Sequence, residues 1–219
     1  MLLFITNTVK WNAAVLLILM VLFLLLQQIR HTSIKNIWLQ RITTMAVLLL
    51  AFFICPSYIK SAIIIPMHTN NIGWNWLIIA GAVIISVNYK LVQQNKFQQL
   101  YAYYKDMEWN VTNIFFHNLS CIFYVVFYEL FFRGWMFQQH QQQFGMVTAF
   151  IINLSLYAVL HIPKGKNEVI GSLFFGTMLC VATVESGSVF PATGLHLMMA
   201  LSFENFMISH YLKQQKSVV

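Results

Sequence analysis

Residues 125–137, VVFYELFFRGWMF, place a carboxylate and a guanidinium in a stretch that is otherwise apolar. Glu129 and Arg133 are spaced i, i+4, so on a helix they lie on one face and can form an ion pair. Such a pair lowers the cost of burying either charge and could simply hold helices together. Charged groups within membrane-crossing segments are costly, however, and they usually face the interior of a bundle and mark a functional site.

Three further ionisable residues occur in later apolar stretches. His161 ends the stretch LYAVLH, Glu168 follows it in NEVIGS, and His196 lies in PATGLHLMM. Counting about 1.5 Å per helical residue from the turn between their helices places Glu129 and His161 at similar depths. We therefore expect Glu129, His161, Glu168 and His196 to share a polar cavity that opens to the cytoplasm.

Two kinds of chemistry suit these side chains. A carboxylate beside a histidine in a low-dielectric cavity can act as the general base that activates water, while imidazoles orient the water or donate to an oxyanion. Glu129, His161 and His196 could instead hold a divalent metal such as zinc, which acidifies its bound water. The sequence leaves both arrangements open.

The elements that position these residues are membrane helices. Of the 219 residues, 59% are hydrophobic and 9% are charged, and a soluble domain of this size would need far more polar residues on its surface. The apolar runs lack the alternation of barrel strands, and each is long enough to cross ~30 Å of hydrocarbon as a helix. We predict an all-α, polytopic bundle of about seven transmembrane helices. The predicted spans are residues 11–29, 42–60, 73–90, 113–137, 145–162, 168–185 and 189–210.

The basic residues determine the orientation of this bundle. The formal net charge is +7, but the Lys and Arg residues are dispersed along the chain, which argues against a nucleic-acid partner. Ten of the thirteen fall in the first, third and fifth loops or in the C-terminal tail, Lys10 and Lys60 fall on the other side, and Arg133 lies within a span. The positive-inside rule then places the N-terminus outside and the C-terminus in the cytoplasm, with the lipid bilayer around the helices.

A polar and aromatic segment divides the chain. Residues 1–112 hold the first three predicted spans and end in a segment, 90–112, that suits a helix lying at the cytoplasmic interface. Residues 113–210 hold the four spans with ionisable groups and form the predicted catalytic core. Residues 211–219 form a cytoplasmic tail.

The remaining histidines and the cysteines have simpler interpretations. The three cysteines lie in different predicted helices without metal-type spacing, so we expect small apolar core residues. A lone histidine in a membrane helix is more often a hydrogen-bonded packing residue than a catalyst. This is the expectation for His31, His68, His117, His140 and His210.

At three places the sequence resembles the motifs of one protease family. YELFFRG (128–134), YAVLH (157–161) and HLMMA (196–200) are similar to the motifs Glu-Glu-x-x-x-Arg, Phe-x-x-x-His and His-x-x-x-Asn/Asp of the CPBP family. These intramembrane endopeptidases include CAAX prenyl proteases and Abi-type immunity proteins. The resemblance covers about residues 114–210. It implies an endopeptidase of the bacterial cytoplasmic membrane whose substrate is a membrane-embedded or membrane-anchored peptide.

The sequence departs from these motifs at two positions. Tyr128 stands where the family has the glutamate usually assigned as the water-activating base, and Ala200 replaces the polar residue of the last motif. A Tyr is a poor base near neutral pH because its reference pKa is ~10. Either Glu129 takes the base role, or Glu168 supplies the missing carboxylate, or the site is inactive. In the last case the protein is a membrane scaffold or an immunity-type binding protein.

The protease hypothesis gives each residue an expected role. Glu129 is the base, Arg133 is its charge partner and His161 orients the water. His196 donates to the oxyanion, and Glu168 is an auxiliary carboxylate. A small transporter that uses Glu129 and Glu168 as proton relays is a third hypothesis, which the lack of a visible inverted repeat in the sequence disfavours.

Overall fold

The computed structural model describes residues 34–54, 74–94, 104–105, 107–162 and 165–217. This part of the chain is helical and contains no strand, so the predicted all-α class is confirmed for it. The first predicted span, 11–29, lies outside it. The elements are α2 (Ile34–Ile54), α4 (Trp74–Val92), α6 (Val111–Glu129), the π-helix η2 (Leu130–Met136), α7 (Phe137–Phe144), α8 (Met146–His161), α9 (Lys166–Ser186) and α10 (Val189–Ser217).

Local sequence signals explain several of the helix ends. The Asn110 side chain accepts a hydrogen bond from the Asn113 backbone N–H at 2.8 Å and so caps the start of α6. The turn that ends α7 uses Gly145 at φ 81°, which a residue with a Cβ rarely adopts. Pro191 lies in the first turn of α10, where a missing N–H costs no helical hydrogen bond. α6, η2 and α7 continue without a break over Val111–Phe144.

Several helices are long and apolar enough to cross a membrane. Among the described residues these are Asn75–Val92, Val111–Phe144 and Lys166–Ser186, and two shorter apolar helices cover Ile37–Leu49 and Met146–His161. The chain is therefore an integral membrane protein by length and composition of its helices. The number of seven spans and the orientation of the termini stay predictions.

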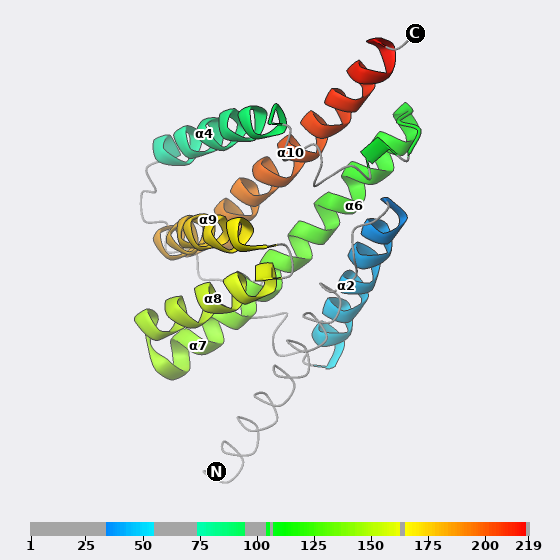
Figure 1. Cartoon of the computed structure of the whole chain (residues 1–219). Coiled ribbons are helices and arrows are strands. Elements are labelled where there is room, and N and C mark those ends of the chain that lie inside the picture. The colour runs from blue at the N-terminus through cyan, green and yellow to red at the C-terminus, as the bar shows by residue number, and fades with distance from the viewer. Residues whose placement is uncertain (1–33, 55–73, 95–103, 106, 163–164, 218–219) are drawn as a thin grey trace.

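Two long helices, α6 and α10, form the centre of the bundle (Figure 1). α2 packs against α6 on one side, α4 packs along α10 on the other, and α9 lies between α8 and α10. The approach of α4 to α10 is close, because a Cβ added to Gly81 would lie 2.7 Å from Met198 Sδ. The N-terminal helices therefore flank the two helices that carry the candidate site residues Glu129 and His196.

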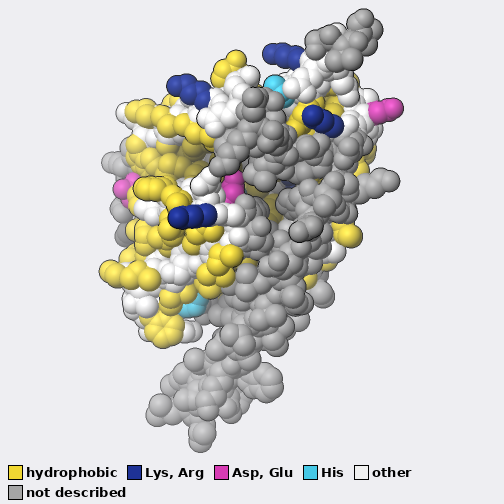
Figure 2. Space-filling model, in the orientation of Figure 1, with side chains coloured by type: hydrophobic (Ala, Val, Ile, Leu, Met, Phe, Trp, Pro, Cys, Tyr) yellow, Lys and Arg dark blue, Asp and Glu magenta, His cyan; other side chains and the backbone are white. Residues whose placement is uncertain are grey.

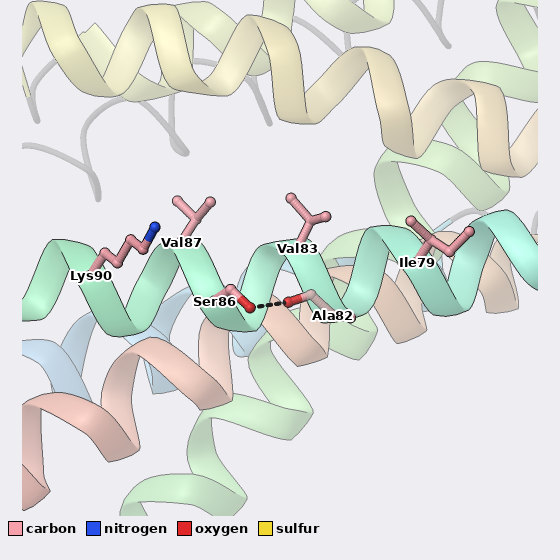
Figure 3. Close-up of a pocket in the computed structure, with 6 residues that line it drawn as sticks. All are labelled: Ile79, Ala82, Val83, Ser86, Val87 and Lys90. Atoms are coloured by element: carbon pink, nitrogen blue, oxygen red, sulfur yellow. Dashed lines mark hydrogen bonds between the residues drawn. The ribbon is translucent and has the colours of Figure 1, made fainter.

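Apolar side chains cover much of the outer surface (Figure 2). A shallow groove on α4, drawn in Figure 3, is lined by Ile79, Ala82, Val83, Ser86, Val87 and Lys90. Its one hydroxyl, on Ser86, is bonded back to the Ala82 carbonyl at 2.8 Å, so the groove offers little polar chemistry. This face has the character of a surface that lies against lipid, with Lys90 in the last turn of the helix.

The predicted interfacial segment, 90–112, is described only in part. α4 ends at Val92, and residues 95–103 and 106 are outside the described residues. Tyr104 and Trp109 are buried, and the Tyr104 ring stacks on Tyr211 of α10 at 6.0 Å between centroids. These two aromatic residues therefore pack against the bundle.

Candidate functional site

The centre of the site is a buried carboxylate at the end of α6. Oε1 of Glu129 accepts a hydrogen bond from Nη1 of Arg133 at 2.8 Å and lies 2.5 Å from Nδ1 of His196 on α10. Because an ionised carboxylate only accepts, Nδ1 of His196 carries the proton of this contact. Glu129 and Arg133 are 0% exposed and His196 is 8% exposed. The two helices at the centre of the bundle thus meet where the Glu129 carboxylate accepts hydrogen bonds from Arg133 and His196.

Part of the hydrogen-bonding capacity of this cluster is unused. Oε2 of Glu129, and Nε and Nη2 of Arg133, are buried and have no hydrogen-bond partner among the described residues. Most buried polar atoms in proteins are bonded, so each exception calls for an explanation, and a catalytic role is one of them. The cluster therefore has one carboxylate oxygen free to act as an acceptor for a reacting group.

The π-helix η2 contains Arg133 and starts directly after Glu129. π-helical turns are rare and occur frequently at functional sites. The buried Asn153 of α8 donates a hydrogen bond from Nδ2 to the Phe132 carbonyl at 2.8 Å, and Cys180 of α9 donates to Asn153 Oδ1 at 3.4 Å. This chain of hydrogen bonds fixes η2 against α8 and α9. Asn153 is not among the site residues predicted from the sequence, although an amide in the apolar stretch before His161 is a visible signal.

Aromatic rings form the walls of the site. The Arg133 guanidinium lies over the Tyr157 ring, 4.6 Å from its centroid, which is a cation–π geometry. The ring of Tyr128 contacts that of His196 edge-on at 5.8 Å, and Phe175 of α9 contacts His196 at 5.6 Å. Tyr128, which stands in place of the first glutamate of the family motif, therefore lines the site with its ring.

The structure places His161 and Glu168 differently from Glu129 and His196. Among the described residues, Glu129 accepts hydrogen bonds from Arg133 and His196 and not from His161 or Glu168. Nδ1 of His161 lies 2.8 Å from the Tyr157 carbonyl of its own helix, and its ring is 4.6 Å from that of Tyr157. Glu168 is partly buried in the first turn of α9.

The structure therefore brings three of the five predicted site residues into direct contact. His161 borders this contact through the Tyr157 ring. The cavity expected around Glu129 is closed, because the carboxylate has no exposed surface. In this conformation solvent does not reach Glu129.

The residues of the site do not fit a divalent metal ion. In the part of the chain that the structure describes, no three His, Cys, Asp or Glu side chains lie close enough together to hold one. The bonded oxygen of Glu129 already faces the Arg133 cation at 2.8 Å, which opposes a second positive charge there. The zinc arrangement that the sequence left open is thus disfavoured by the donor set.

One family model matches the part of the chain that contains the site. Residues 110–202 match the family model described as Type II CAAX prenyl endopeptidase Rce1-like. This segment is similar to the CAAX-protease, or CPBP, family. No curated protein and no solved structure matches the chain. The matched segment contains Glu129, Arg133, His161 and His196, and the resemblance seen in the three motifs is confirmed.

Replacing Gly176 of α9 by alanine tests how tightly the Tyr157 wall is packed. The new Cβ would lie 2.8 Å from Tyr157 Cδ1 and 3.1 Å from Leu154 Cδ1, so a side chain or the helix has to shift. We expect Gly176→Ala to lower the free energy of unfolding in detergent by about 1–3 kcal/mol. Gly171→Ala is the matched control on the same helix, because nothing lies within 4 Å of its Cβ. A Gly176→Ala protein as stable as the control would contradict the close packing.

Proposed function

We propose that the protein is an intramembrane endopeptidase that hydrolyses a peptide bond of a membrane-embedded or membrane-anchored peptide. The observation that carries the proposal is the buried Glu129 carboxylate, with one oxygen held by Arg133 and His196 and the other without a partner. The family of residues 110–202 supports the same reaction class. The proposal assigns the base role to Glu129, since Tyr128 cannot take it at neutral pH.

The proposed reaction uses the free oxygen of Glu129 as the base. Oε2 of Glu129 takes a proton from water, and the oxygen of that water bonds to the carbonyl carbon of the substrate. The carbon–nitrogen bond then breaks, and the proton passes from Glu129 to the leaving nitrogen. Arg133 and His196 keep the carboxylate ionised and aimed before each cycle. His161, beside the Tyr157 ring, orients the water once the site opens.

The search for cleavage products tests this proposal. The full-length protein is reconstituted in liposomes with membrane proteins extracted from its own cells, and new peptide ends are identified by mass spectrometry. We expect ends that the wild type produces and the Glu129→Gln variant does not. A farnesylated CAAX peptide and an unmodified transmembrane peptide, tested separately, then distinguish the two substrate classes. A folded wild-type protein that generates no new ends would contradict the proposal.

A non-catalytic membrane scaffold is the second candidate function. Two observations favour it: the Glu129 carboxylate has no exposed surface, and Tyr128 stands where the family motif has a glutamate. Binding a partner helix requires neither an accessible carboxylate nor that glutamate. The two functions differ in what Glu129 has to do. Cells that lack the native protein would be rescued by the Glu129→Gln variant if the protein is a scaffold, and would not be rescued if it is a protease.

Removal of divalent metal is expected to leave cleavage unchanged. The reason is the donor set, in which Arg133 borders the Glu129 oxygen and no three metal-type ligands meet among the described residues. The measurement is the rate of appearance of the new peptide ends with and without EDTA. Loss of cleavage in EDTA that returns on addition of Zn²⁺ would overturn the carboxylate mechanism.

A further inference from the structure

A second buried ionic cluster joins α10 to three other parts of the chain. The Glu204 carboxylate accepts hydrogen bonds from Arg41 of α2 and from the Tyr104 hydroxyl, and its Oε2 lies 2.8 Å from Nε2 of His117 on α6. Trp38 donates its indole N–H to Nδ1 of His117 at 3.1 Å. Since Nδ1 is the acceptor, Nε2 of the neutral ring carries the proton and donates it to Glu204.

This cluster differs from the site at Glu129 in one chemical respect. Both oxygens of Glu204 have partners, and Arg41 also donates to the His117 carbonyl at 3.3 Å and to Ser120 Oγ at 3.1 Å. A buried ionic network whose members are satisfied rigidifies a fold, whereas Glu129 keeps one oxygen without a partner. The Glu204 cluster is therefore built to hold helices in place.

Both clusters connect α6 to α10 through a glutamate and a histidine, and the two residue types exchange helices between the clusters. In the site, the glutamate is on α6 and the histidine, His196, is on α10. In the second cluster, the histidine, His117, is on α6 and the glutamate, Glu204, is on α10. Next to it, Asn118 and Asn205 exchange two hydrogen bonds of 3.0 Å between the same helices. The register of α10 on α6 is thus set at two levels.

The second cluster lies close enough to affect the first. Glu204 follows His196 on α10 by about two helical turns, or ~12 Å. On α2, Leu48 lies about two turns after Arg41 and packs in the same buried cluster as Tyr128 of the site. Arg41, Tyr104 and Glu204 are outside the family-matched residues 110–202, so that match assigns them no role.

We infer that Glu204 is a positioning residue, which with Arg41 and His117 holds α10 in the register where His196 meets Glu129. The consequence for catalysis rests on the proposed function, but the contact between His196 and Glu129 can be measured without any proteolysis. Loss of the Glu204 charge leaves Arg41 buried without a countercharge and releases α10 at this level. The His196 ring then moves away from the carboxylate.

The test is an NMR measurement of the full-length protein labelled with ¹⁵N-histidine in detergent micelles. The ring signals of His196 are assigned by their loss in His196→Gln. We expect Glu204→Gln to move the His196 signals away from their wild-type positions, because the hydrogen bond between Nδ1 and the Glu129 carboxylate is lost. Glu185→Gln, the same change at an exposed carboxylate of α9, is expected to leave them in place.

Tyr104→Phe covers the case in which Glu204→Gln does not fold. It removes one hydroxyl, keeps the Arg41 ion pair and is expected to give a smaller shift in the same direction. If Glu204 only stabilised the fold, its variants would have a lower melting temperature, but the His196 signals of the folded variants would not move. The inference is overturned if the His196 signals stay at their wild-type positions in the folded variant, whatever the proteolysis assay shows.

Discussion

The Glu129→Gln variant is expected to lose peptide hydrolysis by roughly 10²–10⁴-fold, which is the usual contribution of a general base. The amide has the shape of the carboxylate, and its oxygen can still accept from Arg133 Nη1 and His196 Nδ1. It cannot take a proton from water. The measurement is the rate at which new peptide ends appear in liposomes that contain the variant or the wild type.

Two comparisons sharpen this result. Glu129→Ala would leave Arg133 buried without its partner and destabilise the protein by about 3–5 kcal/mol, so its inactivity alone would not identify a base. His161→Ala removes a partly buried ring at the end of α8, and it is expected to abolish proteolysis with little loss of stability. Full activity in Glu129→Gln and in His161→Ala, both folded, would refute the assignment of the site.

The Arg41→Met variant is expected to lower the free energy of unfolding by about 3–5 kcal/mol, because it leaves Glu204 charged and largely buried. Unfolding is followed by the loss of helical signal as SDS is added to detergent micelles. Lys213→Met, a change of the same kind at an exposed cation of α10, is expected to have little effect.

A double variant separates the buried charge from the lost contact. Arg41→Met combined with Glu204→Leu removes both charges, and we expect it to recover much of the stability that Arg41→Met alone loses. Equal stability of Arg41→Met and the wild type would show that the ion pair contributes nothing. In that event the cluster could not fix the register of α10.

Several parts of the structure follow from the sequence because their signals are local. The predicted span 73–90 corresponds to α4 (Trp74–Val92), since polar residues flank its apolar run. The contact of Glu129 with Arg133 follows from the i, i+4 spacing, and the arrival of His196 follows from the motif order on separate helices. The first two are properties of single helices, which hydropathy and spacing report directly, whereas the contact of His196 follows from the resemblance to the family motifs.

Other parts depend on contacts between distant residues. Arg41 and Glu204 are 163 positions apart, and each taken alone has the appearance of an ordinary charge near the end of a membrane helix. His117 was expected to be a hydrogen-bonded packing residue. It does make two side-chain hydrogen bonds, but the sequence did not indicate that the partners are Trp38 and Glu204. The orientation of the His161 ring and the presence of the π-helix also depend on packing between helices, which hydropathy and spacing do not report.

The crossed arrangement of the two glutamate–histidine pairs has a mechanical consequence. α6 and α10 are fastened to each other at two depths, so they resist separation and behave as one stiff unit. If the protein admits a peptide as proposed, the entrance would open at α8 and α9, which, among the described residues, are not fastened to α6 in this way. The rings of Tyr157 and Phe175, which border the cluster on that side, would be the first groups an incoming chain meets. Their size would act as a gate that sorts incoming peptides by bulk.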